Sequence, residues 1–138
     1  MAKLITWTDN FSVGYTEIDE QHKMLVGMIN ELYDAFTKGE AEEAAESIIS
    51  EMIKYTDYHF KTEEKYFDKY DYSETEEHIK EHQNFVKQVT DFYNEFQKGS
   101  ATVTYDIMSF LRNWLLEHIH DSDKKYSVEF KNKNFTEL

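Results

Sequence analysis

Residues 18–38 read IDEQHKMLVGMINELYDAFTK, and this segment indicates the fold class. Its apolar side chains recur at alternating intervals of four and three residues, which is typical of one buried stripe on an α-helix. His22 occupies a position within that stripe. Lys38 and Gly39 follow the last stripe residue and indicate the end of the helix. The stripe consists of Ile18, His22, Leu25, Ile29, Leu32 and Phe36.

Three further segments show the same helical period. They are predicted at about 41–69, from the 73–76 region to about 97, and from near Thr104 to Asp123. Ser73-Glu-Thr-Glu76 is interpreted as a capping box that opens the third of these helices. The chain has no proline and only four glycines, which favours long uninterrupted helices. Because short loops make successive helices antiparallel, the sequence predicts an all-α, antiparallel up-down-up-down four-helix bundle.

The whole chain, residues 1–138, is expected to form one domain. Residues 1–17 carry apolar side chains without a helical period, so we expect an irregular N-terminal arm that docks on the bundle. The bundle itself should span about 18–123. The tail, about 124–138, is rich in Lys and Asn; Tyr126 and Phe130 extend the last helix by a turn or two before a frayed end.

Composition excludes several classes of function. The chain has 15 basic and 28 acidic residues, a net charge of −13, which disfavours nucleic acid and anionic membranes as partners. It has no cysteine, so disulfides, thiolate ligands and sulfur nucleophiles are excluded. No apolar run has the length of a membrane span, and the first residues do not resemble a signal peptide. We therefore expect a cytoplasmic protein.

Histidines and one glutamate fall on the predicted buried stripes of all four helices. His59 and Glu63, and likewise His78 and His82, are four residues apart, so each pair can face one centre. In an antiparallel bundle, the start of the first and third helices and the end of the second and fourth lie together. Five imidazoles buried at one level would each need partners for their nitrogens, and a metal supplies them. The sequence therefore predicts a metal site.

The fourth helix leaves its carboxylate ligand undecided. A straight helix aligns His118 with Asp121 better than with Asp123, whereas a bulge with i→i+5 pairing, or unwinding at the helix end, brings Asp123 round instead. His120 lies two residues from His118, on the opposite face, and is expected at the surface.

The set formed by His22, His59-x-x-x-Glu63, His78-x-x-x-His82 and His118-x-x-x-x-Asp123 resembles the hemerythrin family, specifically its single-domain bacterial members. The resemblance extends over nearly the whole chain. It includes the arm from Trp7 to Gly14 and the segments Ile18-Asp-Glu-Gln-His22 and Trp114-Leu-Leu-Glu-His118.

This resemblance implies a non-haem di-iron centre and places the last ligand at Asp123. One iron would be held by His78, His82 and His118, and the other by His22 and His59. Glu63, Asp123 and an oxo or hydroxo group would bridge the two irons. That ligand count leaves one open position, on the iron with two histidines, where dioxygen would bind.

Five apolar positions match the family's oxygen pocket: Leu25, Phe60, Trp114, Leu115 and Ile119. Ordinary core packing explains them equally well, and the two roles are compatible. We expect reversible binding of dioxygen for storage, delivery or scavenging, by a monomer that is not an enzyme. The alternatives are an oxygen or redox sensor acting through a partner, and a di-iron enzyme such as a peroxidase, ferroxidase or nitric oxide reductase. A purely structural metal site is disfavoured by the open position.

Overall fold

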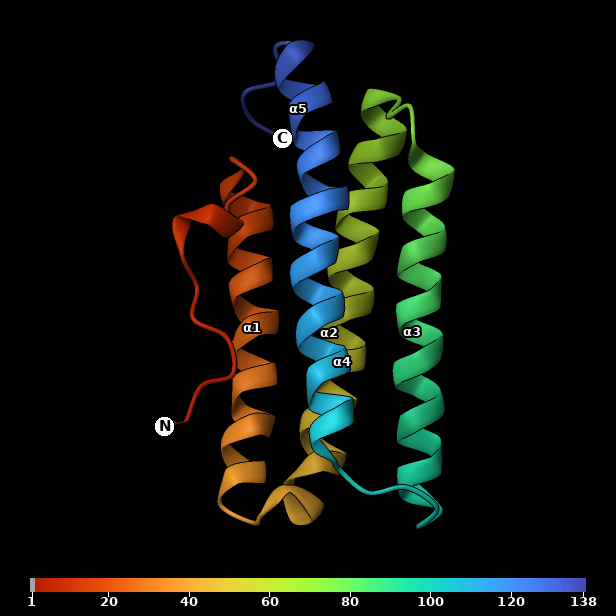
Figure 1. Ribbon diagram of the computed structural model, residues 1–138. Coiled ribbons are helices and arrows are strands. Elements are labelled where there is room, and N and C mark those ends of the chain that lie inside the picture. Colours follow the sequence, from red (N-terminus) through yellow and green to blue (C-terminus); the bar gives the residue numbers. More distant parts are fainter. Residues whose placement is uncertain (1) are drawn as a thin grey trace.

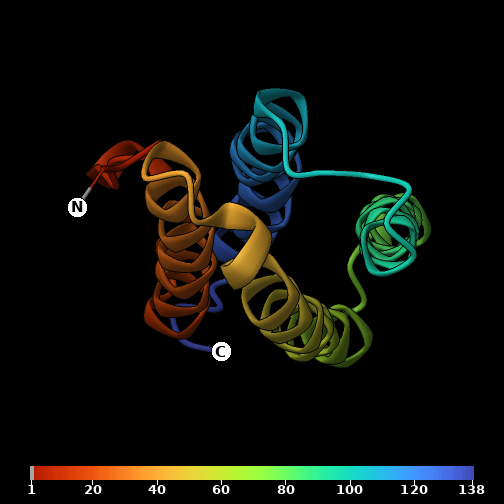
Figure 2. The ribbon, with the colours of Figure 1, turned by 90° about the horizontal axis from the view of Figure 1, so that it is seen from below.

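The structure is a computed structural model that describes residues 2–138, and it consists of long helices that alternate in direction along the chain (Figure 1). Seen along the bundle axis, the helices surround a common interior, with α3 beside α2 (Figure 2). This arrangement confirms the predicted up-down-up-down bundle. The long helices are α1 (Thr16–Thr37), α2 (Ala41–Tyr70), α3 (Thr75–Gln97) and α4 (Tyr105–Glu117).

The last helix continues past Asp123 through Tyr126 and Phe130, as the sequence predicted, and ends at Asn132. α4 passes into a π-helical segment, η2 (His118–Asp123), and then into α5 (Lys124–Asn132). Tyr126 and Phe130 of α5 are fully buried. The C-terminal residues therefore form part of the core around the upper end of the bundle in Figure 1.

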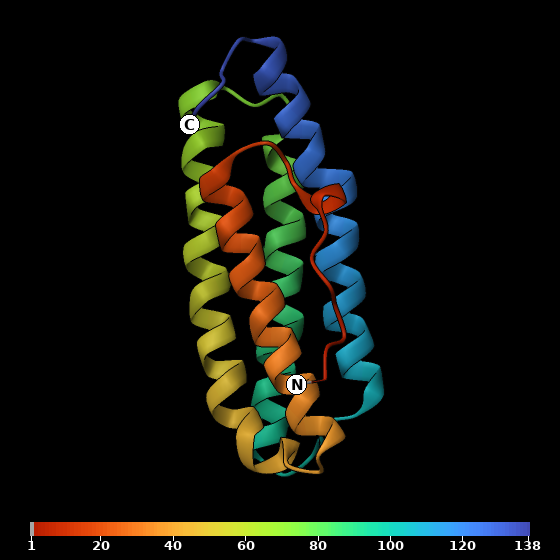
Figure 3. The ribbon, with the colours of Figure 1, turned by 90° about the vertical axis from the view of Figure 1, so that its left-hand side faces the viewer.

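The N-terminal arm runs along the outside of the bundle and contains one short 3₁₀ turn, η1 (Asp9–Phe11) (Figure 3). The buried side chain of Asn30 in α1 accepts hydrogen bonds from the backbone N–H of Leu4 and Ile5, both at 2.9 Å, and donates one to the Ile5 carbonyl at 2.8 Å. At the other end of the arm, the Ser127 hydroxyl of α5 donates to the Val13 carbonyl. The arm is thus held by α1 and α5 together.

The predicted capping box at the start of α3 is wrong. The N-cap residue is Glu74, and it makes no capping hydrogen bond with its side chain. Ser73 instead bonds to Glu129 of α5 through both its hydroxyl and its backbone N–H, the latter at 3.0 Å from Oε2. The carboxylate of Glu129 in α5 therefore binds Ser73, which leaves the serine unavailable as a cap for α3.

The predicted end of α1 is confirmed, since Gly39 follows the C-cap residue Lys38 with a φ of +73°.

Side chains from all the long helices, the arm and α5 form the hydrophobic core. Within residues 2–138, no helix has the length and apolar character required to cross a membrane.

Candidate metal centre

Seven polar side chains are buried together at the end of the bundle where α1 and α3 begin. Each of the four helical rods contributes at least one of them, because the rods alternate in direction. None is more than 5% exposed, although such residues ordinarily lie at the surface. They are His22, His59, Glu63, His78, His82, His118 and Asp123.

These side chains form two groups whose potential ligand atoms lie within 4.8 Å of one another. The first group contains Glu63, His78, His82, His118 and Asp123, and the second contains His22, His59, Glu63 and Asp123. Glu63 and Asp123 belong to both groups. Two carboxylates are therefore placed between two sets of histidines, as a pair of neighbouring cations would require.

The inward-facing atoms approach one another without satisfying one another. Asp123 Oδ2 lies 2.9 Å from His22 Nε2, and Oδ1 lies 3.0 Å from His78 Nε2 and 3.2 Å from His118 Nε2. Both Asp123 oxygens and the Nε2 atoms of His22 and His78 nevertheless lack a hydrogen bond of acceptable geometry. Unpaired buried polar atoms carry a free-energy penalty, so their convergence fits a site that holds cations. Glu63 Oε1 and His59 Nε2 are unpaired in the same way.

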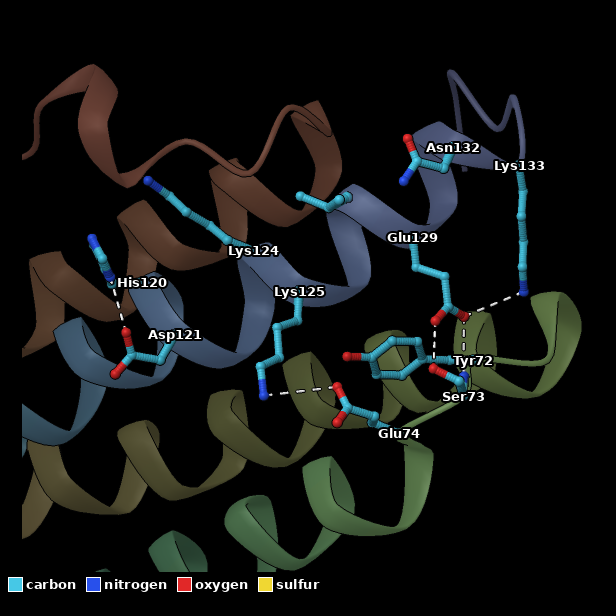
Figure 4. A pocket seen from close by; sticks show the side chains of 11 residues that line it. Tyr72, Ser73, Glu74, His120, Asp121, Lys124, Lys125, Glu129, Asn132 and Lys133 are labelled. Atoms are coloured by element: carbon cyan, nitrogen blue, oxygen red, sulfur yellow. Dashed lines mark hydrogen bonds and ion pairs between the residues drawn. The ribbon is translucent and has the colours of Figure 1, made fainter.

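The π-helical segment settles which aspartate joins the cluster. Its i→i+5 pairing brings Asp123 onto the face of His118, as the bulge alternative required. Asp121 is exposed and pairs with exposed His120, at 3.0 Å between Oδ1 and Nδ1. Both residues line an open surface pocket of about 800 Å³ outside the cluster, shown in Figure 4. The surface position predicted for His120 is therefore confirmed.

The two carboxylates are ionised at neutral pH despite being buried. Burial alone would raise the pKa of Asp123, but His118, His22 and His78 outweigh it and hold the pKa well below its ordinary value. Glu63 behaves alike: burial and Asp123 oppose its ionisation, and the neighbouring histidines reverse the shift, so its pKa is also lowered. Both groups are thus available as anionic ligands.

Three of the histidines have shifted pKa values, and the shifts differ in direction. Burial lowers the pKa of His59 to about 3, because Glu63 compensates only in part. Burial also disfavours the charged forms of His78 and His118, but Asp123 and Glu63 outweigh it and raise their pKa values to about 9 and about 10. In the metal-free protein, protons therefore occupy part of the space between the ligands. Metal binding must release them.

A layer of polar partners that was not predicted from the sequence surrounds the cluster. Gln21 Oε1 lies 2.7 Å from His59 Nδ1, and Glu64 Oε2 lies 2.9 Å from His82 Nδ1. The hydroxyl of Tyr126 donates to Glu63 Oε2 at 2.7 Å. Gln21 and Glu64 are chain neighbours of ligand candidates, which offered a weak signal. Tyr126 had none, because it lies distant in the chain from Glu63 and was predicted only to extend the last helix.

The five residues predicted to line an oxygen pocket come from α1, α2, α4 and η2. Leu25, Leu115 and Ile119 are buried in the hydrophobic core. The ring of Phe60 stacks on His82, with centroids 3.7 Å apart and an interplanar angle of 5°. Half-buried Trp114 stacks on His118 at 4.5 Å and lies 6.0 Å from Phe60. Two of the five residues thus stack directly on imidazoles of the cluster.

A helical bundle with a buried His/Glu/Asp cluster defines this chain as a metal-binding four-helix bundle protein. The family model described as Hemerythrin HHE cation binding domain matches residues 13–127. The chain belongs to the hemerythrin family.

Individual relatives agree with this assignment. A bacteriohemerythrin of Pseudomonas aeruginosa (strain LESB58) is 36% identical, over 91% of this chain and 80% of that protein. One from Methylococcus capsulatus is 35% identical, over 89% of this chain and 94% of that protein. A crystal structure of a wild-type hemerythrin superimposes with a TM-score of 0.85 at 33% identity, covering 91% of this chain and 96% of that one.

Proposed function

We propose that this chain binds dioxygen reversibly at a non-haem di-iron centre. The observation that carries the proposal is the sharing of Glu63 and Asp123 between the two ligand groups. In this assignment both carboxylates would be shared by the two irons, together with an oxo or hydroxo group. His78, His82 and His118 would hold one iron, and His22 and His59 would hold the other. The relatives named as bacteriohemerythrins support the same assignment.

The composition of the ligand set limits the chemistry. When bound, the two irons supply electrons that dioxygen can accept and return. Five neutral imidazoles and only two carboxylates stabilise highly oxidised iron less than a carboxylate-rich set does, which favours reversible transfer. The second position has one histidine fewer than the first, and we assign dioxygen binding to it. The histidine-rich set thus supports a carrier rather than an oxidising enzyme.

The surrounding side chains exclude water from the centre. We propose Leu25, Phe60, Trp114, Leu115 and Ile119 as the lining of the oxygen pocket. Phe60 and Trp114 stack on His82 and His118, and the other three are buried in the hydrophobic core. Exclusion of water slows loss of the electrons to solvent and keeps the irons reducible. Storage, delivery or scavenging of dioxygen each require such a dry, reversible site.

Oxygen cycling tests the proposal. We expect the purified protein to bind two irons per chain and to undergo a reversible change of its visible absorption when the reduced protein meets air and is then degassed. The Asp121→Ala variant should behave like the wild-type protein, because the carboxylate that it removes lies outside the cluster. Binding of a single metal ion, or bleaching with sustained turnover of peroxide, would contradict the proposal; the latter would favour an enzyme.

A further inference from the structure

The two ligand groups differ in the charge of the residues behind their histidines. The nitrogens of His59 and His82 that point into the cluster are Nε2, so their Nδ1 atoms face outward. Behind His59 stands the neutral amide of Gln21, at 2.7 Å. Behind His82 stands the carboxylate of Glu64, at 2.9 Å. One imidazole therefore donates its proton toward a dipole and the other toward a full charge.

The same asymmetry holds for the other histidines whose outer nitrogen is described. His118 Nδ1 has no hydrogen-bond partner, but it lies 3.8 Å from Oε1 of Glu81, a second carboxylate, which accepts a hydrogen bond of 2.8 Å from the Ser122 hydroxyl. In the opposite group, Nδ1 of His22 is buried and has no hydrogen-bond partner. The three-histidine group thus has one carboxylate hydrogen-bonded behind His82 and a second, more distant one near His118, whereas the two-histidine group has none behind His22 or His59.

The outer partner of a metal-binding imidazole alters its strength as a ligand. A carboxylate that accepts the Nδ1 proton makes the ring more basic and increases electron donation to the cation, whereas an amide does so much less. Gln21 is only 5% exposed, so replacing its hydrogen bond to His59 by one to water would cost free energy. Glu64 is partly exposed, with a side-chain accessibility of 31%, yet it keeps its bond to His82.

We propose that Gln21 and Glu64 are tuning residues that make the two metal positions unequal, with the two-histidine position the weaker and more easily reduced one. This inference rests on the proposed di-iron function. An iron with less electron donation retains its reduced form more readily. An iron at the position assigned to dioxygen would therefore return to its reduced state when dioxygen leaves, and the position backed by Glu64 would hold its ion more tightly.

Reciprocal substitutions test this inference. Gln21→Glu replaces the amide by a carboxylate, and Glu64→Gln makes the opposite exchange with nearly the same shape. We expect Gln21→Glu to lower the midpoint potential of the iron-loaded protein and Glu64→Gln to raise it, measured by spectroelectrochemistry. Gln88→Glu and Glu95→Gln are the controls, because they make the same exchanges on the exposed surface of α3. Neither control should move the potential.

Zinc binding to the metal-free protein gives a second readout that does not depend on oxygen chemistry. Competition with a chelator should show Zn²⁺ affinity reduced about ten- to hundredfold at one of two steps in Glu64→Gln, and increased in Gln21→Glu. Circular dichroism reports whether each variant folds. If Gln21→Glu does not fold, Glu64→Gln decides alone, since its site is partly exposed. If both variants bind two ions with the same midpoint potential and the same Zn²⁺ affinity as the wild-type protein, the inference is overturned. Fewer than two ions in the wild-type protein would instead overturn the di-iron proposal.

Discussion

The hydroxyl of Tyr126 donates a hydrogen bond of 2.7 Å to Glu63 Oε2, although the two residues are 63 positions apart in the chain. Tyr126 is fully buried, and burial together with the charge of Glu63 raises its pKa well above the ordinary value. It is therefore a permanent donor at physiological pH. This bond ties α5 to the carboxylate that both ligand groups share.

Removing this hydroxyl should weaken the bundle. In Tyr126→Phe, Glu63 loses a donor inside the core, and hydrogen bonds to charged groups contribute about 1.5–3 kcal/mol. We expect the free energy of unfolding of the metal-free protein, measured in urea, to fall by about that amount. Tyr105→Phe is the control, since Tyr105 is 58% exposed, and it should change stability little. Equal effects of the two substitutions would contradict a specific role for Tyr126.

The choice between the two aspartates can be tested directly. Asp123→Ala removes a carboxylate common to both ligand groups, and we expect metal analysis to show loss of bound iron. Asp121→Ala removes a carboxylate that faces solvent and should leave the iron content unchanged. The reverse pattern would mean that the segment after Glu117 is a straight α-helix in the metal-loaded protein.

Water exclusion can be tested at Leu115. Leu115→Ala opens space near the cluster, and we expect oxidation of the oxygen-loaded protein in air to become several-fold faster. The control is Leu111→Ala, one helical turn further from the cluster on the same face of α4 and equally buried. Both variants should lose about 2–5 kcal/mol of stability. Faster oxidation of Leu115→Ala than of Leu111→Ala would support a role for Leu115 in excluding water. Equal rates would mean that Leu115 only packs the core.

The histidine pKa values predict how stability changes at alkaline pH. In the metal-free protein, the pKa values of His78 and His118, about 9 and about 10, lie above the ordinary 6.5. Their stabilising contribution is fully present below pH 6.5 and is lost as the pH rises through 9 to 10. Urea unfolding at a series of pH values should show this fall.

Two controls accompany the pH series. The His118→Gln variant should show a shallower fall between pH 6.5 and 10, because one of the two groups is missing. The metal-loaded protein should lack the fall, since metal has already displaced the protons. A metal-free protein whose stability stays constant over this range would show that these histidines are not protonated.

Helix number, direction and the inward faces were predictable because each depends on short-range periodicity. The stripe from Ile18 to Phe36 specifies a buried face, and short connections then bring the histidine-bearing ends together. Asp123 could be assigned from the family resemblance but not from helix spacing, since a regular α-helix would have favoured Asp121.

Contacts between distant elements could not be predicted in this way. The sequence around Ser73 fits a local cap, and only the folded chain shows that Glu129 reaches it from α5. Likewise, the bonds from Gln21 to His59 and from Tyr126 to Glu63 join different helices. Periodicity reports which face of a helix is buried, but it does not report which residue of a neighbouring helix lies opposite.

The extra residue in the π-helical segment also sets the rotation of everything that follows it. Each residue of an α-helix advances the chain by about 100° around the helix axis. Deleting one residue between His118 and Asp123 would therefore turn α5 by about that angle, and would carry Tyr126 and Phe130 off the inward face. A single deletion there would displace Asp123, the Tyr126 donor and the Ser127 contact with the arm from their partners at the same time. This short segment therefore cannot change in length without the loss of these contacts.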